Sequence, residues 1–238
     1  ICKKNYLPLH GNCKIYNMYQ LEQNINLHVS VDCVLIGFDG DSFRVLLVKQ
    51  YGKVFDSAMN DMKLPGSLIY DDEDLDDAAK RVLSELTGLK NVKMRQFKAY
   101  GSKNRTRNPK DVLWLERFHR LDEKKIDRIV TIAYLALVKI DKSFEKLSTK
   151  YDAQWMPVDE VKNLAFDHYQ IMLDALAYIK HYVENTPAVL FDLLPKKFTE
   201  SQLRTLYQLI YNKVFDVRNF HKKIVQMSYV VPLDEKEV

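Results

Sequence analysis

One stretch of the chain, residues 63–89, carries the signals of a loop that leads into a helix. Pro65 and Gly66 are typical of a turn, and Gly88 stands where a helix would end. The acidic run 71–74 lies where a helix N-terminus favours negative charge. Apolar residues recur in between at helical spacing, namely Leu75, Ala78, Ala79, Val82, Leu83 and Leu86. The stretch therefore predicts an amphipathic helix that packs on a larger structure.

Several residues of this stretch match a known motif once one residue is inserted after Gly66. The motif is the Nudix box, G-x5-E-x7-R-E-U-x-E-E-x-G-U, where U is a bulky aliphatic residue. The matching residues are Gly66, Glu73, Arg81, Leu83, Glu85, Gly88 and Leu89. Two glutamates of the motif are replaced here, by Val82 and Leu86. The resemblance implies the Nudix fold, an α+β structure described as an α/β/α sandwich with a mixed sheet.

The two replaced glutamates bear on catalysis. Nudix hydrolases cleave nucleoside diphosphate derivatives, and carboxylates of the box helix hold Mg²⁺ against the pyrophosphate. Because Mg²⁺ demands oxygen ligands, Val82 and Leu86 cannot stand in for glutamate. We therefore expect no catalytic residue, no metal site and no cofactor. The alternative from another class is a residual hydrolase that uses a shifted carboxylate set, Asp74, Asp77 and Glu85.

Composition sets broad limits on the protein. The 238 residues are 47% hydrophobic, which is enough for the core of one large domain or two smaller ones. The net charge of +4 is too small to argue for nucleic acid over the whole chain. The three cysteines, Cys2, Cys13 and Cys33, have no metal-site spacing. The absence of a membrane-length apolar run and of a signal peptide predicts a cytoplasmic protein without a membrane partner.

The first part of the chain has the pattern of a mixed α/β domain. Residues 1–26 lack a clean period, and we interpret them as an N-terminal extension that either contacts a partner or is disordered. We expect strands over 28–38, 43–49, 92–100 and 128–138, with a turn at 39–41 that joins the first two. A short strand within 154–161 and a long helix to about Glu184 complete a Nudix-like domain over 27–185.

A basic insert separates two of these strands. Residues 101–127 contain Lys103, Arg105 and Arg107 among other basic residues, with Trp114 and Phe118 interleaved. A connection of this length is usually functional or mobile. Two interpretations stay open at this point, a solvated loop with a short surface helix, or a contact to the DNA backbone or to a second subunit.

The C-terminal part, residues 186–238, follows a break at Asn185–Pro187 and predicts two short helices. Thr199 is suited to cap a helix over 200–212, and Asp216 to cap one over 217–228. The residues expected to face inward are Leu203, Leu206, Leu209, Ile210, Phe220, Ile224 and Val225. Two helices joined by a tight turn, the second with a basic outer face, are typical of a helix-turn-helix unit. A unit that binds another protein is the alternative.

Motifs in both parts resemble the Nudix-related transcriptional regulators of bacteria. They are Phe198-Thr199-x-x-Gln202-Leu203-x-x-Leu206-Tyr207, Arg218-Asn219-Phe220-x-x-Lys223-Ile224, Leu164–His168 and Arg128-x-x-Thr131-x-Ala133-Tyr134. The resemblance implies a homodimer with a C-terminal winged helix-turn-helix domain that binds operator DNA. The wing hairpin expected after Met227 is not visible in the sequence. The expected DNA-contacting residues are Lys196, Lys197, Thr199, Gln202, Arg218, Asn219, His221, Lys222 and Lys223.

In this family a small molecule in the Nudix pocket controls operator binding. The sequence is most similar to the arabinose-responsive branch, so we expect L-arabinose to bind and to weaken operator binding, with ADP-ribose as the alternative effector. The candidate effector-binding residues are Lys63, Gly66, Tyr100, Asp167 and His168. Structural roles are open for three of them, since Asp167 and His168 could cap the following helix and Tyr100 could belong to the core.

Overall fold

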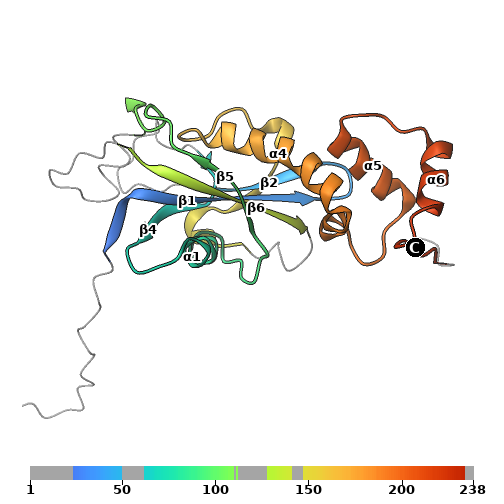
Figure 1. The fold of residues 1–238 in the computed structure, drawn as a ribbon, viewed down its shortest axis with the longest axis horizontal. Helices are drawn as coiled ribbons and strands as arrows, with labels where there is room; N and C mark the ends of the chain where they lie inside the picture. The colour runs from blue at the N-terminus through green and yellow to red at the C-terminus, as the bar shows by residue number, and fades with distance from the viewer. Residues whose placement is uncertain (1–23, 50–61, 110, 112–127, 141–146, 234–238) are drawn as a thin grey trace, which may run out of the picture.

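The computed structural model describes residues 24–49, 62–109, 111, 128–140 and 147–233. The N-terminal extension up to residue 23 and the greater part of the basic insert, with Trp114 and Phe118, lie outside the described residues. The molecule is elongated, with a sheet-containing part at one end and a smaller helical part at the other (Figure 1). None of the helices that the structure describes is long and apolar enough to cross a membrane.

The larger part is built on one mixed sheet. Its strands are β1 (Ile25–Phe38), β2 (Phe43–Lys49), β3 (Met62–Lys63), β4 (Gly66–Tyr70), β5 (Arg95–Tyr100), β6 (Val130–Lys139) and β7 (Gln154–Pro157). The order is β3-β2-β1-β6-β5, with β4 paired to β1 and β7 to β2. The central pair β1 and β6 is parallel, and the other pairs are antiparallel. The mixed sheet confirms the fold prediction.

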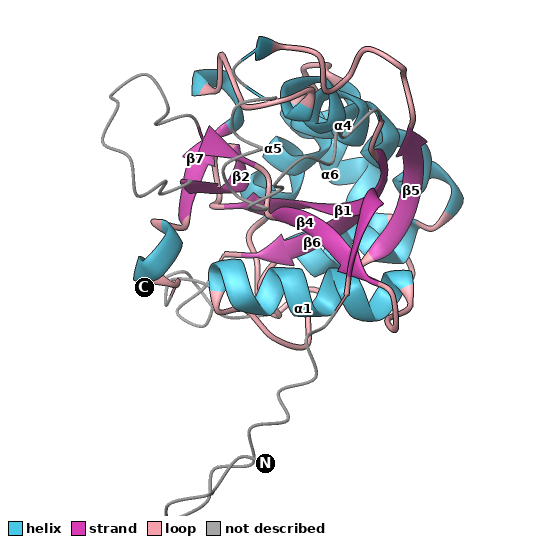
Figure 2. Cartoon of the chain, turned by 90° about the vertical axis from the view of Figure 1, so that its left-hand side faces the viewer, coloured by secondary structure: helices cyan, strands magenta, loops and turns pink. Residues whose placement is uncertain are grey.

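Two long helices cover opposite faces of this sheet (Figures 1 and 2). Helix α1 (Leu75–Thr87) packs Ala79 and Val82 against Cys33 and its neighbours on one face of β1. Helix α4 (His168–Asn185) packs on the other face, in one cluster with Val34 and Ile36. Successive residues of a strand point to opposite faces, so β1 supplies both cores. The structure is therefore the predicted α/β/α sandwich.

The box helix begins and ends where the sequence indicates. Asp74 occupies the N-cap position, and Gly88 ends the helix with a φ of 81° and an N–H that donates to the Ser84 carbonyl. Glycine adopts this left-handed conformation without steric cost, which explains the residue at this place. The predicted apolar face is confirmed, because Ala78, Ala79, Val82 and Leu83 are buried, with Leu75 and Leu86 packed at its edge.

The helical part follows α4 without leaving the core. The 3₁₀ helix η4 (Pro187–Leu193) leads to α5 (Glu200–Tyr211) and α6 (Val217–Val225), and two shorter 3₁₀ helices, η2 (Thr149–Tyr151) and η3 (Val158–Glu160), flank β7. Leu190 of η4, Leu203 of α5 and Phe220 of α6 belong to one buried cluster together with α4. This cluster bridges the break at 185–187, and the domain boundary there stays a prediction.

Three local predictions differ from the structure. Strand β5 begins at Arg95 rather than at residue 92, because Val92 and Met94 pack beneath α1 instead. Helix α6 ends at Val225, three residues before the expected end. Val225 was expected to face inward but is 72% exposed. It follows the buried Phe220 by five residues, and at about 100° per residue that rotation turns the side chain away from the core.

Both helix caps of the helical part are confirmed. Thr199 accepts the Gln202 N–H on its side chain at 3.2 Å, and the Gln202 side chain accepts the Thr199 N–H at 2.9 Å. These two bonds form a capping box at the start of α5. At the start of α6 the Asp216 side chain accepts the Asn219 N–H at 3.0 Å. The caps fix where the two helices begin, and therefore which residues of α6 face outward.

The capping box leads to a prediction about stability. We expect Thr199→Ala to lower the free energy of unfolding by about 0.5–2 kcal/mol, because the Gln202 N–H at the start of α5 loses its acceptor. Ser201→Ala, at an exposed position of the same helical turn, is the matched control and should leave stability almost unchanged. Urea unfolding followed by circular dichroism measures both. Equal losses in the two variants would contradict a capping role for Thr199.

Candidate functional site

A group of polar side chains lies inside the sandwich, where α4 begins beside the central strands. We call it the polar cluster, and its members are Asp32 of β1, Lys63 of β3, Arg105 of the loop after β5, Thr131 of β6, and Asp167 and His168 at the start of α4. The cluster contains three of the five predicted effector-binding residues, Lys63, Asp167 and His168. Asp32, Arg105 and Thr131 were not among the predicted effector-binding residues, although a single aspartate within an apolar strand was a usable signal.

The carboxylate of Asp32 lies at the centre of the cluster, and its side chain is only 5% exposed. Its Oδ2 accepts a hydrogen bond of 2.8 Å from Thr131 Oγ1, and it lies 3.9 Å from Arg105 Nη2. Its Oδ1 lies 3.4 Å from His168 Nε2. A buried charge is tolerated only with such partners, so the neighbours of Asp32 are determined by its charge.

Lys63 is buried beside this carboxylate. Its Nζ donates a hydrogen bond of 2.7 Å to the carbonyl oxygen of Gly66. Burial lowers the pKa of Lys63 to about 8, while the nearby charge of Asp32 acts in the opposite direction. The lysine therefore ties β3 to the loop before the box helix, and it loses its proton at a lower pH than an exposed lysine.

His168 is buried and is oriented by the backbone. Its Nδ1 accepts the Leu64 N–H at 3.0 Å, so the proton of the neutral ring is on Nε2, the atom that faces Asp32. Burial lowers the pKa of His168, and Asp32 opposes that shift. The side chain therefore joins α4 to the strand β3 region and does not serve as a cap of its own helix.

Arg105 forms a bidentate ion pair with Asp167 within the cluster. Its Nε and Nη2 donate to the two carboxylate oxygens of Asp167 at 2.9 and 2.7 Å, and its Nη1 donates to the carbonyl of Ile129 at 3.2 Å. Asp167 occupies the N-cap position of α4, but its side chain makes no capping bond. A bidentate pair of this kind is charge-assisted and geometrically specific. Arg105 is 5% exposed in its side chain, so neither open interpretation of the basic insert is correct for this residue.

Tyr100 lies next to the cluster and bonds elsewhere. Its hydroxyl donates to Asp174 Oδ2 at 2.8 Å, and Lys98 Nζ lies 2.5 Å from the same oxygen. Burial and the Asp174 carboxylate raise the pKa of Tyr100. The half-buried ring is thus attached to the side of α4, and its role in binding an effector stays a prediction.

Gly66 has a steric reason to be glycine. A β-carbon at this position would collide with Asp32 Oδ1, and it would lie 2.9 Å from Asp32 Cγ and 3.0 Å from the Val31 carbonyl oxygen. The first residue of the Nudix box is therefore required by the approach of the Asp32 carboxylate to the backbone of β4. This contact connects the box to the polar cluster.

The carboxylates of the box are engaged with cations of the same helix. Arg81 binds Glu73 through two bonds of 2.6 and 2.7 Å, lies 3.2 Å from Glu85 Oε2, and stacks over the Tyr70 ring at 4.1 Å. Asp77 pairs with Lys80. Within the described part of the chain, no three His, Cys, Asp or Glu side chains are placed to hold a metal ion.

The residues of the box therefore do not fit the magnesium site of a Nudix hydrolase. Val82 is fully buried in the apolar cluster under α1, and Leu86 packs at its edge. Neither position offers an oxygen, and Glu85 faces Arg81. The shifted set of Asp74, Asp77 and Glu85 is not brought together either.

The outer face of α6 carries several of the predicted DNA-contacting residues. Arg218, Asn219 and Lys222 are exposed there. His221 Nδ1 lies 2.9 Å from Glu200 Oε2 of α5, and Lys223 Nζ lies 4.4 Å from the centre of the Tyr207 ring. Lys196 and Lys197 are exposed before α5, while Thr199 and Gln202 form its capping box. The DNA-contacting roles of all nine residues stay predictions.

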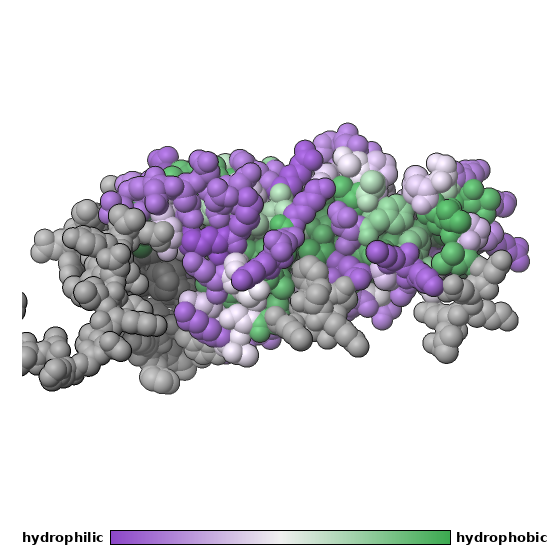
Figure 3. Space-filling view, turned by 90° about the horizontal axis from the view of Figure 1, so that it is seen from below, coloured by the Kyte–Doolittle hydropathy of each residue, from purple (hydrophilic) through white to green (hydrophobic). Residues whose placement is uncertain are grey.

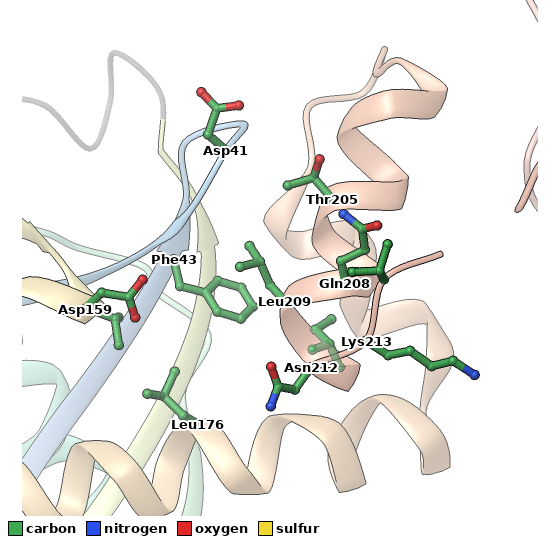
Figure 4. A pocket seen from close by; sticks show the side chains of 12 residues that line it. Asp41, Phe43, Asp159, Leu176, Thr205, Gln208, Leu209, Asn212 and Lys213 are labelled. Carbon is green, nitrogen blue, oxygen red and sulfur yellow. The ribbon is translucent and has the colours of Figure 1, made fainter. Parts of the chain in front are cut away.

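A cavity of ≈ 570 Å³ lies where the two parts of the molecule meet (Figure 4). Phe43 of β2 and Leu176 of α4 line one side, and Leu209 of α5 lies opposite them. Gln208 and Asn212 add polar groups on the α5 side. The cavity opens to solvent beside the contact between the two parts, while the apolar core under it is continuous from α4 through η4 to α5.

Comparison with known proteins assigns both parts. The model of the NUDIX domain matches residues 26–175, and the model of the NrtR DNA-binding winged helix domain matches residues 190–238. The chain is 22% identical over 214 residues to the ADPR responsive transcriptional repressor NtrR of Acinetobacter baylyi, covering 88% of this chain and 77% of the relative.

Solved structures show the same fold. The crystal structure of Shewanella oneidensis NrtR matches with a TM-score of 0.62 and 24% identity, covering 84% of this chain and 85% of the other. The complex of that protein with a 27mer DNA matches with a TM-score of 0.60 and 23% identity over 84% and 83% of the two chains. A Nudix domain and a DNA-binding winged helix in one chain define the class of Nudix-related transcriptional regulators. The chain belongs to the NUDIX domain family.

The contact between Gly66 and Asp32 leads to a second prediction. We expect Gly66→Ala to destabilise the protein by about 1–3 kcal/mol, because the added methyl group collides with a buried carboxylate that cannot move freely. Gly101→Ala is the matched control, since its β-carbon would meet only Val130 at an ordinary 3.6 Å. Urea unfolding measures both variants. A stable Gly66→Ala protein would contradict the placement of Asp32.

The lowered pKa of Lys63 leads to a third prediction. Between the folded pKa of about 8 and the ordinary 10.5, the unfolded chain binds more protons at this residue than the folded one, so stability rises with pH. Loss of the Lys63 proton can raise the free energy of unfolding by at most about 1.4 kcal/mol for each pH unit in this range. We expect urea unfolding at about pH 7.5 and about pH 9.5 to show this rise, and Lys63→Met to flatten it. Lys162→Met, at an exposed lysine, should keep the slope of the unaltered protein.

Proposed function

We propose that this protein is a transcriptional regulator in which a non-hydrolytic Nudix domain binds an effector and controls operator binding by the winged helix. The supporting observation is the replacement of metal-binding glutamates by Val82, within the core, and by Leu86 at its edge. The helix-turn-helix part nevertheless keeps both caps and an exposed basic face. The domain thus keeps its fold but lacks the carboxylates that would hold Mg²⁺. Such a domain suits binding of a small molecule more than its hydrolysis.

The proposed effector is ADP-ribose rather than L-arabinose. The relative from Acinetobacter baylyi is named for its response to ADPR, the abbreviation of ADP-ribose, and this favours the alternative effector of the sequence analysis. The charges point the same way, because the loop after β5 presents exposed Lys103 and Arg107 beside Arg105. Cations stabilise a pyrophosphate but bring nothing specific to a neutral pentose.

Helix α4 is the proposed connection between effector and DNA. Its N-terminus holds Asp167 and His168 in the polar cluster, and its C-terminus leads directly into η4 and the winged helix. Its 18 residues span about 27 Å. An anionic effector that competes with Asp167 for Arg105 would change the contacts that position this helix. Leu176 faces Leu209 across the cavity, so a shift of α4 reaches α5.

The proposed regulator acts as a homodimer on a palindromic operator. Dimers of helix-turn-helix proteins place their recognition helices about one DNA turn apart, so a small change of angle between domains misplaces one helix relative to its groove. Because such a misplacement costs contacts with DNA, the proposed effect of ADP-ribose is to weaken operator binding. Light scattering of the full chain with and without DNA measures the state of assembly.

Calorimetry with the full chain tests the effector. We expect saturable binding of ADP-ribose, little or no heat with L-arabinose, and recovery of intact ADP-ribose after incubation with Mg²⁺. Arg105→Ala should weaken ADP-ribose binding, whereas Arg95→Ala, at an exposed arginine on the same strand-loop segment, should not. Saturable binding of L-arabinose alone would restore the sugar as effector, and Mg²⁺-dependent cleavage abolished by Glu85→Gln would contradict the absence of hydrolysis.

The coupling between ADP-ribose binding and operator binding can be tested from both sides with the same protein. A tenfold loss of operator affinity with ADP-ribose corresponds to about 1.4 kcal/mol of coupling. Operator DNA must then weaken ADP-ribose binding by the same factor, because coupling free energies are reciprocal. ADP-ribose binding that is unaffected by operator DNA would show that the ligand does not control the winged helix.

The exposed face of α6 leads to a prediction about DNA. We expect Lys222→Ala to weaken binding to all duplexes and to lower the salt dependence by about one unit, as for a phosphate contact. Arg218→Ala should cost about 1–3 kcal/mol on the operator and less on random DNA, because it lies near the helix N-terminus that meets base edges. Lys90→Ala, after α1, is the control. Equal effects of Arg218→Ala on both duplexes would indicate a different contacting face.

A further inference from the structure

The first residue of α6 is an exposed valine. Val217 is 57% exposed and follows directly on Asp216, whose side chain caps the helix through the Asn219 N–H. The cap fixes Val217 at the N-terminal end of α6, next to Arg218. On the lower face of the molecule, apolar and hydrophilic surface lie side by side at the end where α6 lies (Figure 3).

The position of Val217 on the helix surface is defined by the buried Phe220. At about 100° per residue, Val217 lies between the inward stripe of Phe220 and Ile224 and the ridge of Arg218 and Lys222, and it is exposed. The basic face of α6 therefore has an apolar group at its leading edge. A single exposed valine is common in proteins, but this one stands at the end of a helix that, in helix-turn-helix proteins, contacts base edges.

We propose that Val217 contacts the C5-methyl group of a thymine in each operator half-site and so contributes to sequence recognition. This inference rests on the proposed DNA binding. Thymine is the base that presents a methyl group in the major groove, and apolar side chains recognise it by contact. Valine suits this role because its branched side chain is stiff at χ1 and keeps its methyl groups in place.

Two other exposed valines near α6 are less suited to this contact. Val225 lies eight residues further along, at the C-terminal end of α6 and about 12 Å from Val217, whereas the N-terminal residues of such a helix contact base edges. Val214 precedes the helix and lines the cavity between the two parts of the molecule. Val225 therefore offers a matched control, with the same side chain on the same helix.

The test uses the full chain and operator duplexes selected from a random library with this protein. Each thymine of the selected duplex is replaced in turn by deoxyuracil, which removes only the methyl group. We expect one replacement per half-site to weaken binding about fourfold, as for one buried methyl group. In Val217→Ala the same replacement should have less than about a twofold effect, since the partner of the methyl group is gone.

The control variant and the outcomes separate this inference from the proposed function. Val225→Ala should keep the full sensitivity to deoxyuracil, and thermal unfolding should show both exposed variants folded. If deoxyuracil weakens binding equally in Val217→Ala and in the unaltered protein, the thymine contact is overturned while DNA binding stands. The same holds if no deoxyuracil replacement changes the affinity for the operator. Failure to select any duplex would overturn the proposed DNA binding, and this contact with it.

Discussion

The buried carboxylate of Asp32 is the constraint on which the arrangement of the site depends. A charge in this position requires compensation, and Thr131, His168 and Arg105 approach it from a strand, a helix and a loop. The same carboxylate excludes any side chain at Gly66. One residue of β1 therefore lies against the box loop, the start of α4 and the segment after β5.

Helix α4 belongs to both parts of the molecule. Its first residues are held by the polar cluster, its buried stripe packs on the sheet, and its far end continues into the helices of the winged-helix part. The apolar core is continuous along it, and a cavity lies beside the junction at Leu209. Under the proposed function, a ligand at the charged site would act on α5 and α6 through this helix.

The Nudix box of this chain separates structural from catalytic requirements. Arg81 still joins Glu73, Glu85 and the Tyr70 ring, and Gly88 still ends the helix, so the loop and helix keep their shape. The two replaced glutamates carried oxygen atoms that folding does not need, and Val82 instead adds apolar burial under α1. The shape of the box helix therefore does not depend on glutamates at these two positions, since Val82 packs in the core and Leu86 at its edge.

The sequence by itself determined the box helix and both caps of α5 and α6, because these depend on periodicity and on residues within one or two turns of each other. The mixed sheet was implied by the resemblance to the Nudix family, since its central parallel pair, β1 and β6, joins residues far apart in the chain. The polar cluster was decided only by the tertiary structure. Arg105 meets Asp167 across 62 positions and Asp32 meets Thr131 across 99, and periodicity reports only near neighbours. The burial of Arg105 likewise depends on the fold. A basic residue in a loop is ordinarily exposed to solvent, and Arg105 is buried because the fold brings the carboxylate of Asp167 next to it.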